Sequence, residues 1–313
     1  MSKSLSLLEQ VPLTVEQAVL SKKIIDGKQV AKDVREELKV QVEAATTKYG
    51  RKPGLAVVLI GDNPASHTYV KNKVTACKNV GIESFMFQYD KDVDEKTIVE
   101  CLAKLNQDPL VDGILVQLPL PKHLPTQEIL ALIDPSKDVD GLTAINLGRL
   151  ARGDEGLFPC TPLGIMRLLA AYKVPIKGKN VVVLGRSHLV GKPVALMLLA
   201  QDATVTICHS KTSNLPEVCR QADVLVAACG QPEMVKGDWV KPGAVVIDVG
   251  TTRVEKADGT SALKGDVEFD AAFENASLIT PVPGGVGPMT IAMLLVNTQK
   301  SFELRMQSRF MHS

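Results

Sequence analysis

The chain has few aromatic residues and almost no net charge. Phe, Trp and Tyr make up 4% of its 313 residues, so Val, Leu, Ile and Ala must form most of the core. That composition suits a buried parallel sheet. Lys and Arg number 36 against 35 Asp and Glu, a net charge of +1. This balance favours neither a nucleic acid nor an acidic membrane surface as a partner.

The cysteines form no CxxC pair, and no apolar run is long enough to span a bilayer. Without paired spacing, a zinc site or a disulfide framework is not expected, and reduced thiols in the cytoplasm are the simpler interpretation. The first 20 residues lack a signal-peptide core, and the acidic Glu9 and Glu16 disfavour a transit peptide. We interpret them as a short extension that could form a helix.

Strands and helices are predicted to alternate in two successive series. Helical spacing covers 27–49, 66–80, 94–108, 126–133, 163–173 and segments from about 190 and about 288. Short apolar runs predict strands at 54–61, 84–90, 112–121, 181–185, 203–208, 223–229, 244–250 and 277–282. Such alternation predicts an α/β protein with parallel sheets covered by helices on both faces. We expect two domains, 1–150 and 151–288, with the helix 289–313 packing back on the first.

The segment VVVLGRSHLVGKP (181–193) predicts a dinucleotide-binding turn. Gly185 permits the tight bend, and the following helix N-terminus presents free N–H groups to a diphosphate. Ser187 replaces the middle glycine of the usual GxGxxG, but the strand-turn-helix context supports the motif. The next strand ends in CHSKT (208–212), without the acidic residue of NAD-binding domains, and Arg186 lies in the turn. A cation and a hydroxyl suit a 2′-phosphate, so the sequence favours NADP over NAD.

Several polar residues of the first series are candidates for a site. Tyr69 and Lys73 are four apart on a predicted helix and share one face, and a desolvated lysine can act as an acid or a base. The pair also resembles the YxxxK of short-chain dehydrogenases, but here it precedes the nucleotide turn, and a surface pair is the alternative. Gln117, at a strand end, lines a crevice or bonds the adjacent backbone. Asp138 and Asp140 could bind a metal or cap their loop.

Ordered motifs across roughly residues 23–300 closely resemble the bifunctional methylenetetrahydrofolate dehydrogenase/cyclohydrolase family. They are SxxYVxxK (66–73), VQLPLP (116–121), KDVDG (137–141), PCTP (159–162), GRSxxVGxP (185–193), CHSKT (208–212) and PVPGGVGPMT (281–290). The glycine-rich last motif lets the backbone approach a ligand closely. The resemblance implies an N-terminal catalytic domain, a C-terminal Rossmann domain, a cleft between them and a homodimer. It implies NADP as cofactor and no metal.

The resemblance also implies two reactions and a set of residues for them. A hydride passes from 5,10-methylenetetrahydrofolate to NADP, and the 5,10-methenyl product is hydrolysed to 10-formyltetrahydrofolate. Catalytic roles are implied for Lys73, Gln117 and Asp140. Folate contacts are implied for Tyr69, Lys73, Val116, Gln117, Leu118, Asp140, Pro283, Gly284, Gly285, Val286 and Gly287. NADP contacts are implied for Thr161, Gly185, Arg186, Ser187, Ser210 and Thr251.

Two positions depart from the family pattern, and three other functions remain to be separated from this one. His188 replaces a lysine or small residue, and Thr251 stands where isoleucine is usual, which affects the packing there. The alternatives are a dehydrogenase without cyclohydrolase activity, a non-catalytic NADP-binding regulator, and a different two-domain dehydrogenase of the shikimate or amino-acid type. Intact Lys73 and Gln117 argue against the first, and the presence of Tyr69, Lys73 and Asp140 argues against the second. The third predicts a different catalytic motif in the first domain.

Overall fold

The computed structural model describes residues 23–255 and 260–311; the helix expected in the first 20 residues lies outside the described residues. The chain divides into two compact units. The three-stranded unit comprises Lys32–Cys160 and the chain from Ile291 onward. The five-stranded unit comprises the described residues up to Ala31 together with Thr161–Thr290. Across the described ranges, no helix is long and apolar enough to cross a membrane.

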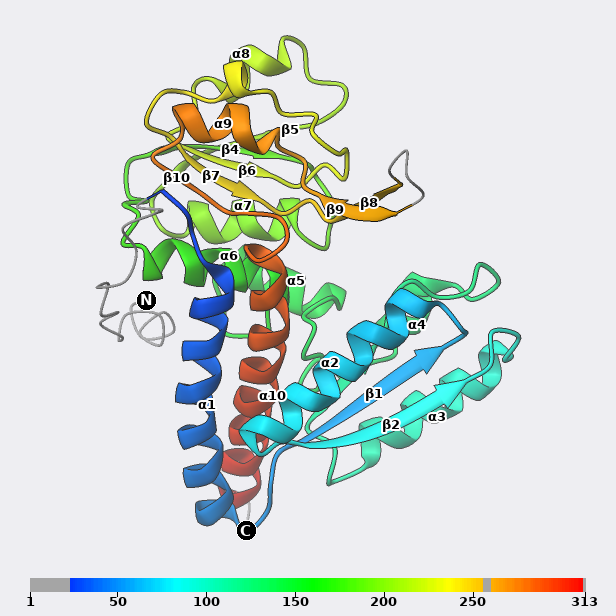
Figure 1. Cartoon of the computed structure of the whole chain (residues 1–313). Helices are drawn as coiled ribbons and strands as arrows, with labels where there is room; N and C mark the ends of the chain where they lie inside the picture. Colours follow the sequence, from blue (N-terminus) through cyan, green and yellow to red (C-terminus); the bar gives the residue numbers. More distant parts are fainter. Residues whose placement is uncertain (1–22, 256–259, 312–313) are drawn as a thin grey trace. The chain divides into compact units, whose positions relative to one another are not determined.

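In the described part of the three-stranded unit, the sheet has the order β2-β1-β3, and both pairings are parallel. Figure 1 shows α2 on one face of this sheet and α3 on the other. Every residue of β1 is buried, as expected for a central strand covered on both faces. The elements are α1 (Gly27–Tyr49), β1 (Gly54–Ile60), α2 (Pro64–Val80), β2 (Glu83–Tyr89), α3 (Glu95–Gln107), β3 (Gly113–Val116), α4 (Thr126–Ala131), α5 (Ala144–Arg152) and α10 (Val286–Met311).

Local sequence sets the limits of α2 and β3. The Asn63 side chain accepts hydrogen bonds from the N–H groups of Ala65 and Ser66 at 2.9 and 3.3 Å, which caps the start of α2. Gly81 ends the helix in the left-handed conformation. The strand expected at 112–121 was too long: β3 ends at Val116, because the prolines that follow cannot donate to a ladder.

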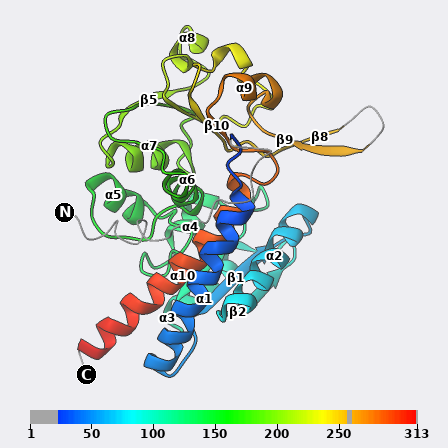
Figure 2. The ribbon, with the colours of Figure 1, turned by 60° about the vertical axis from the view of Figure 1, so that its left-hand side comes forward.

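The last helix packs against the first one within the three-stranded unit. Figures 1 and 2 both show α10 running beside α1. The Tyr49 and Phe302 rings meet edge to face, with centroids 5.5 Å apart. The fully buried Asp112 accepts two 2.7 Å hydrogen bonds from the Arg51 guanidinium, and the Ser301 hydroxyl donates to the Asp112 carbonyl oxygen. These contacts link the end of α10 to the segments before β1 and β3.

The main sheet of the five-stranded unit is parallel throughout its described strands, in the order β10-β7-β6-β4-β5. Figure 1 shows α7 on one face and α8 and α9 on the other, which confirms the predicted α/β class. The elements are α6 (Cys160–Ala171), β4 (Asn180–Leu184), α7 (Gly191–Leu199), β5 (Thr204–Cys208), α8 (Leu215–Cys219), β6 (Val224–Ala227), η2 (Gly237–Trp239), β7 (Val245–Asp248), α9 (Phe269–Asn275) and β10 (Leu278–Ile279).

The five-stranded unit has a reversal in its strand order, which bears on function, and a hairpin outside its main sheet. The chain passes from β4 to β5 on one side and then to β6 on the other, so the strand order reverses beside β4. Open parallel sheets bind ligands at such a switch point, outside the carboxyl ends of the strands. A β8–β9 hairpin (Thr252–Glu255 and Ser261–Lys264), which we did not expect from the sequence, projects from this sheet (Figure 2).

Candidate active site

Lys73 and Gln117 meet in the three-stranded unit. Lys73 lies on α2 and is 9% exposed, and its Nζ donates a 2.9 Å hydrogen bond to Oε1 of Gln117. Gln117 directly follows β3, and its Nε2 donates to the Leu118 carbonyl oxygen at 2.7 Å. The predicted bond to the adjacent backbone is therefore confirmed, and the role of lining a ligand crevice stays a prediction. The backbone holds one end of the amide, and the other end is presented to the lysine.

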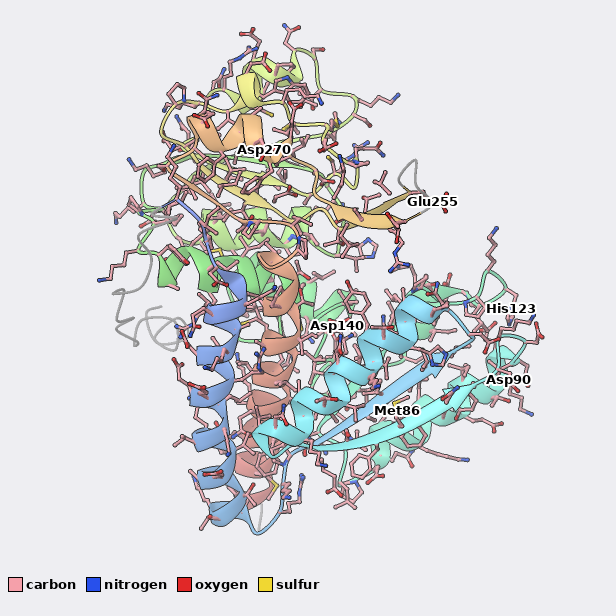
Figure 3. All side chains as sticks on the ribbon, viewed as in Figure 1. Met86, Asp90, His123, Asp140, Glu255 and Asp270 are labelled. Carbon is pink, nitrogen blue, oxygen red and sulfur yellow. The ribbon has the colours of Figure 1, made fainter. Side chains whose placement is uncertain are left out.

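Asp140 lies near the same lysine. Figure 3 shows Asp140 beside α2, and the Lys73 charge acts on its carboxyl group. Burial raises the pKa of Asp140 above its ordinary value, and the nearby Asp138 raises it further, while Lys73 opposes the shift. The thiol of Cys160 is almost fully buried, and burial together with the Asp140 charge raises its pKa well above the usual range. This corner of the unit therefore places two buried ionisable groups, Lys73 and Cys160, beside a half-buried carboxyl group.

Asp138 caps its own loop. It is 1% exposed and accepts hydrogen bonds from the N–H groups of Leu142 and Thr143 and from the Asn146 side chain at 3.1, 2.8 and 3.0 Å. The described residues contain no cluster of three or more His, Cys, Asp or Glu side chains suited to a metal ion. The capping alternative for this loop is therefore the one that the contacts support.

Asn297, which the sequence pattern did not single out, supports the loop that carries Asp140. This side chain on α10 is 3% exposed, and its Nδ2 donates 2.8 Å hydrogen bonds to the carbonyl oxygens of Val139 and Phe158. It therefore connects the segment that carries Asp140 to the segment that leads to Cys160. An asparagine within the apolar run IAMLLVNT was the available signal, because a buried amide requires partners.

The other predicted folate positions of the three-stranded unit differ in exposure. Tyr69 is 47% exposed on α2, so its ring is available for stacking. Val116 is 2% exposed, and its side chain belongs to the hydrophobic core between the sheet, α3 and α4. Leu118 is half-buried beside that core. Of these three, Tyr69 offers the largest accessible surface to a ligand.

The predicted phosphate turn follows β4 in the five-stranded unit. Gly185 has a φ of 125°, and a Cβ there would overlap the Ala228 carbonyl, so only glycine fits this position. The Ser187 hydroxyl accepts hydrogen bonds from the N–H groups of Val190 and Gly191 at 3.1 and 3.4 Å. The serine that replaces the usual middle glycine therefore stabilises the start of α7. Arg186 is exposed next to it.

The neighbouring strand end supplies a hydroxyl on the same edge. The N–H of Gly185 donates to the Cys208 carbonyl at 2.8 Å, which joins the ends of β4 and β5. Ser210 is exposed just beyond β5, as Arg186 is beyond β4. A fixed turn with an exposed cation and an exposed hydroxyl fits a dinucleotide with a 2′-phosphate, so the residues present suit NADP.

The remaining predicted positions also lie in the five-stranded unit. Thr251 is exposed shortly after β7, and Thr161 is half-buried with its hydroxyl 2.9 Å from that of Thr290. In the glycine loop 283–287, the Gly284 carbonyl accepts a 3.1 Å hydrogen bond from the N–H of Lys28, and the Gly285 N–H donates to Pro281 at 2.8 Å. Pro283 and Gly287 are exposed, whereas Gly285 and Val286 are buried. The loop backbone is thus fixed from both sides.

Models of known protein families match the chain in two successive segments. The catalytic-domain model of tetrahydrofolate dehydrogenase/cyclohydrolase matches residues 25–140, and the NAD(P)-binding-domain model matches residues 159–306. The Bifunctional protein FolD of Acetivibrio thermocellus is 50% identical over 283 residues, 90% of this chain and 98% of that protein.

Two solved structures are also similar along nearly their whole length. The FolD methylenetetrahydrofolate dehydrogenase/cyclohydrolase of Campylobacter jejuni is 47% identical with a TM-score of 0.86, covering 90% of this chain and 99% of that one. The Trypanosoma brucei enzyme, complexed with NADP cofactor and inhibitor, is 42% identical with a TM-score of 0.85, covering 90% and 97%. The chain therefore belongs to the tetrahydrofolate dehydrogenase/cyclohydrolase family.

Proposed function

We propose that this chain oxidises 5,10-methylenetetrahydrofolate with NADP and hydrolyses the 5,10-methenyl product to 10-formyltetrahydrofolate. The observation that carries the proposal is the hydrogen bond of the buried Lys73 to Gln117 next to Asp140, because the hydrolytic step needs a proton-transferring group. Family membership and the two named activities of the relatives support the same assignment.

The oxidation depends on positioning more than on acid–base chemistry. Loss of a hydride leaves a cation delocalised over two nitrogens, which needs no proton transfer. NADP, when bound, supplies the hydride acceptor. For this step Tyr69 stacks on the pterin ring, Asp140 accepts hydrogen bonds from the pterin amino group, and the loop 283–287 contacts the folate. Gly185, Arg186, Ser187 and Ser210 hold the phosphates, and Thr161 and Thr251 complete the cofactor site.

The hydrolysis depends on Lys73. Water adds to the carbon of the cationic methenyl group and loses a proton. The bond from that carbon to N5 then breaks as N5 gains a proton, and the hydroxyl on that carbon releases its own proton to solvent as the formyl C=O forms. Lys73 accepts the first proton and supplies the second, so no net proton is retained by the enzyme. Gln117 fixes the Nζ through its Oε1, while its own amide is held by Leu118. Val116 and Leu118 support this arrangement from the core.

A spectrophotometric assay tests both activities. The purified protein is mixed with methylenetetrahydrofolate and either NADP or NAD, and NADPH and the methenyl product are followed at their separate absorption bands. We expect turnover with NADP, followed by decay of the methenyl band. Lack of turnover with both cofactors would refute the dehydrogenase assignment. A persistent methenyl band would leave a dehydrogenase without cyclohydrolase activity, and a preference for NAD would refute the role given to Arg186 and Ser210.

We further propose that the enzyme acts as a homodimer in the cytoplasm. Strand β2 is an edge of its sheet among the described strands, and Met86 on it is 42% exposed (Figure 3). An apolar open edge favours pairing with a second copy. The cysteines are all free thiols, in agreement with a reducing compartment. Sedimentation tests the assembly: Met86→Lys should shift a dimer towards monomer, and a monomeric wild type would refute it.

A further inference from the structure

Two buried carboxylates lie at the carboxyl end of the main sheet in the five-stranded unit, and neither was assigned a role above. Asp248 is the last residue of β7 and is 2% exposed, and Asp266 follows β9 and is 0% exposed. Neither has a cationic side chain among its hydrogen-bond partners in the described residues. Buried charges without cationic partners are costly, so their presence calls for an explanation.

Their oxygens bind backbone N–H groups of three separate segments. Oδ1 of Asp248 accepts hydrogen bonds from Gly250 at 2.9 Å and from Asp266 at 2.8 Å, and Oδ2 accepts one from Val267 at 3.0 Å. Oδ2 of Asp266 accepts hydrogen bonds from Cys229 and Gly230 at 2.7 and 2.9 Å. The two side chains therefore join the turn after β6, the turn after β7 and the segment after β9.

The arrangement of Asp248 and Asp266 has features that residues serving only to connect segments would not need. Oδ1 of Asp266 is buried without a hydrogen-bond partner. Burial raises the pKa of Asp248 to about 6, and the Asp266 charge raises it as well. An unsatisfied oxygen and two neighbouring acids lower stability, whereas apolar packing would not. Such costs are typical of positions held for function.

The segments that these carboxylates hold lie next to the cofactor positions. The Ala228 carbonyl lies against Gly185 in the phosphate turn, and Cys229 and Gly230 follow Ala228 directly. Gly250 immediately precedes Thr251, which is exposed. The 2′-phosphate end of the dinucleotide belongs to the β5 side of the switch point, so the nicotinamide half belongs to the β6 and β7 side.

We propose that Asp248 and Asp266 are positioning residues that fix the turns 228–230 and 249–251 for the nicotinamide half of NADP. The inference rests on the proposed dehydrogenase function. It predicts a specific division: loss of the carboxylates weakens contacts to the nicotinamide half and leaves contacts to the adenosine half intact. It also predicts that hydrolysis of methenyltetrahydrofolate, which needs no hydride acceptor, continues.

Calorimetric titration with NADPH and with 2′,5′-ADP tests this division, because the second probe carries only the adenosine half. In Asp266→Ala we expect about tenfold weaker NADPH binding, as for loss of charge-assisted hydrogen bonds, with 2′,5′-ADP binding changed less than about twofold. Asp266→Asn keeps one acceptor for Cys229 and Gly230 and should restore most of the affinity. The matched control is Asp223→Asn, which removes a carboxylate that accepts from the Asn180 N–H at the opposite end of the sheet.

Each outcome decides the proposal. Equal weakening of both probes, or unchanged NADPH binding in Asp266→Ala, would overturn it, as would the same effect in Asp223→Asn. If Asp266→Ala does not fold, Gly265→Ala takes its place, because its Cβ would overlap the Asp248 carboxylate while both acids remain. The same selective loss is expected there. A wild-type protein that binds neither probe would instead refute the NADP assignment itself and the inference with it.

Discussion

The two units present their polar site residues in opposite ways. In the three-stranded unit, Lys73 is buried and hydrogen-bonded to Gln117, with Asp140 nearby. In the five-stranded unit, Arg186 and Ser210 are exposed. The part of this site with a fixed conformation is the backbone of the turn at Gly185. Proton transfer benefits from desolvated groups with few alternative positions, whereas a large charged cofactor needs accessible donors on a fixed backbone. These two environments are the ones that the proposed proton transfer by Lys73 and the proposed NADP binding require.

The largest expected effect comes from removing the buried amine of Lys73, which should affect the site in the three-stranded unit and not cofactor binding in the five-stranded unit. Lys73→Met should lower the rate of methenyltetrahydrofolate hydrolysis by on the order of 10²–10⁴-fold, the range for loss of a general acid–base group. NADPH binding, measured by fluorescence, should not change. Lys78→Met is the control, because Lys78 is exposed on the same helix. Retained hydrolysis in Lys73→Met would remove the mechanistic basis of the comparison.

The reverse experiment removes the exposed cation. Arg186→Ala should raise the KM for NADP by roughly 10–100-fold, because it loses charge-assisted hydrogen bonds to the 2′-phosphate. The KM for NAD, which lacks that phosphate, serves as the internal control and should stay within about twofold. Hydrolysis should be unaffected. A parallel rise for NAD would mean that Arg186 supports the turn and does not read the phosphate.

A substitution at Asn297 tests whether the site around Lys73 and Asp140 depends on the hydrogen bonds of this amide. Asn297→Ala removes the amide donor from the carbonyl oxygens of Val139 and Phe158, and among the described residues only the first of these has another donor, the Cys160 thiol. We therefore expect a loss of about 1–3 kcal/mol in unfolding free energy and a KM for methylenetetrahydrofolate raised several-fold. Thr298→Ala is the matched control, because that hydroxyl donates to Leu294 within its own helix. Urea denaturation and steady-state kinetics measure the two effects. An unchanged KM in Asn297→Ala would show that the Asp140 loop keeps its position without this amide.

The smallest expected effect is the pH dependence of stability from Asp248. Its folded pKa of about 6 exceeds the unfolded value of about 3.9, so the folded state binds the extra proton between these values. Its stabilising contribution is complete below the unfolded pKa and is lost as pH rises through about 6. Linkage gives a loss of about 1.4 kcal/mol from about pH 5 to about pH 7.5.

Urea denaturation of wild type and Asp248→Asn at both pH values measures this contribution as the difference between their pH slopes. Asp223→Asn is the control, because the Lys241 ammonium lowers the pKa of Asp223 and that carboxyl is ionised in both states over this range. Identical slopes for wild type and Asp248→Asn would show that Asp248 does not titrate here.

Residue spacing predicted part of the site but not the contacts within it. The spacing of four between Tyr69 and Lys73 indicated a shared helix face, yet their environments differ: the tyrosine is exposed and the lysine is buried. The hydrogen bond from Lys73 to Gln117 joins positions 44 apart, and no local pattern encodes such a distance. The family resemblance implied that Lys73 and Gln117 belong to one site, and the structure shows the contact between them.

Asp138 and Asp140 illustrate the same limit at closer range. Both acids stand in KDVDG, and the sequence left metal binding and loop capping open for the pair. The fold directs Asp138 towards Leu142, Thr143 and Asn146, and it leaves Asp140 beside Lys73. The direction of a loop side chain depends on contacts that form only after the helices have packed.

The sequence alone determined the α/β class, the parallel strands and the turn at Gly185, because hydrophobic periodicity and the conformational needs of glycine are local properties. Its ordered motifs also indicated the family. Only the tertiary structure decided that Asn297 supports the Asp140 loop and that Asp248 and Asp266 connect three segments after β6, β7 and β9. These contacts join residues distant in the chain, and their energies depend on burial, which exists only once the chain is folded.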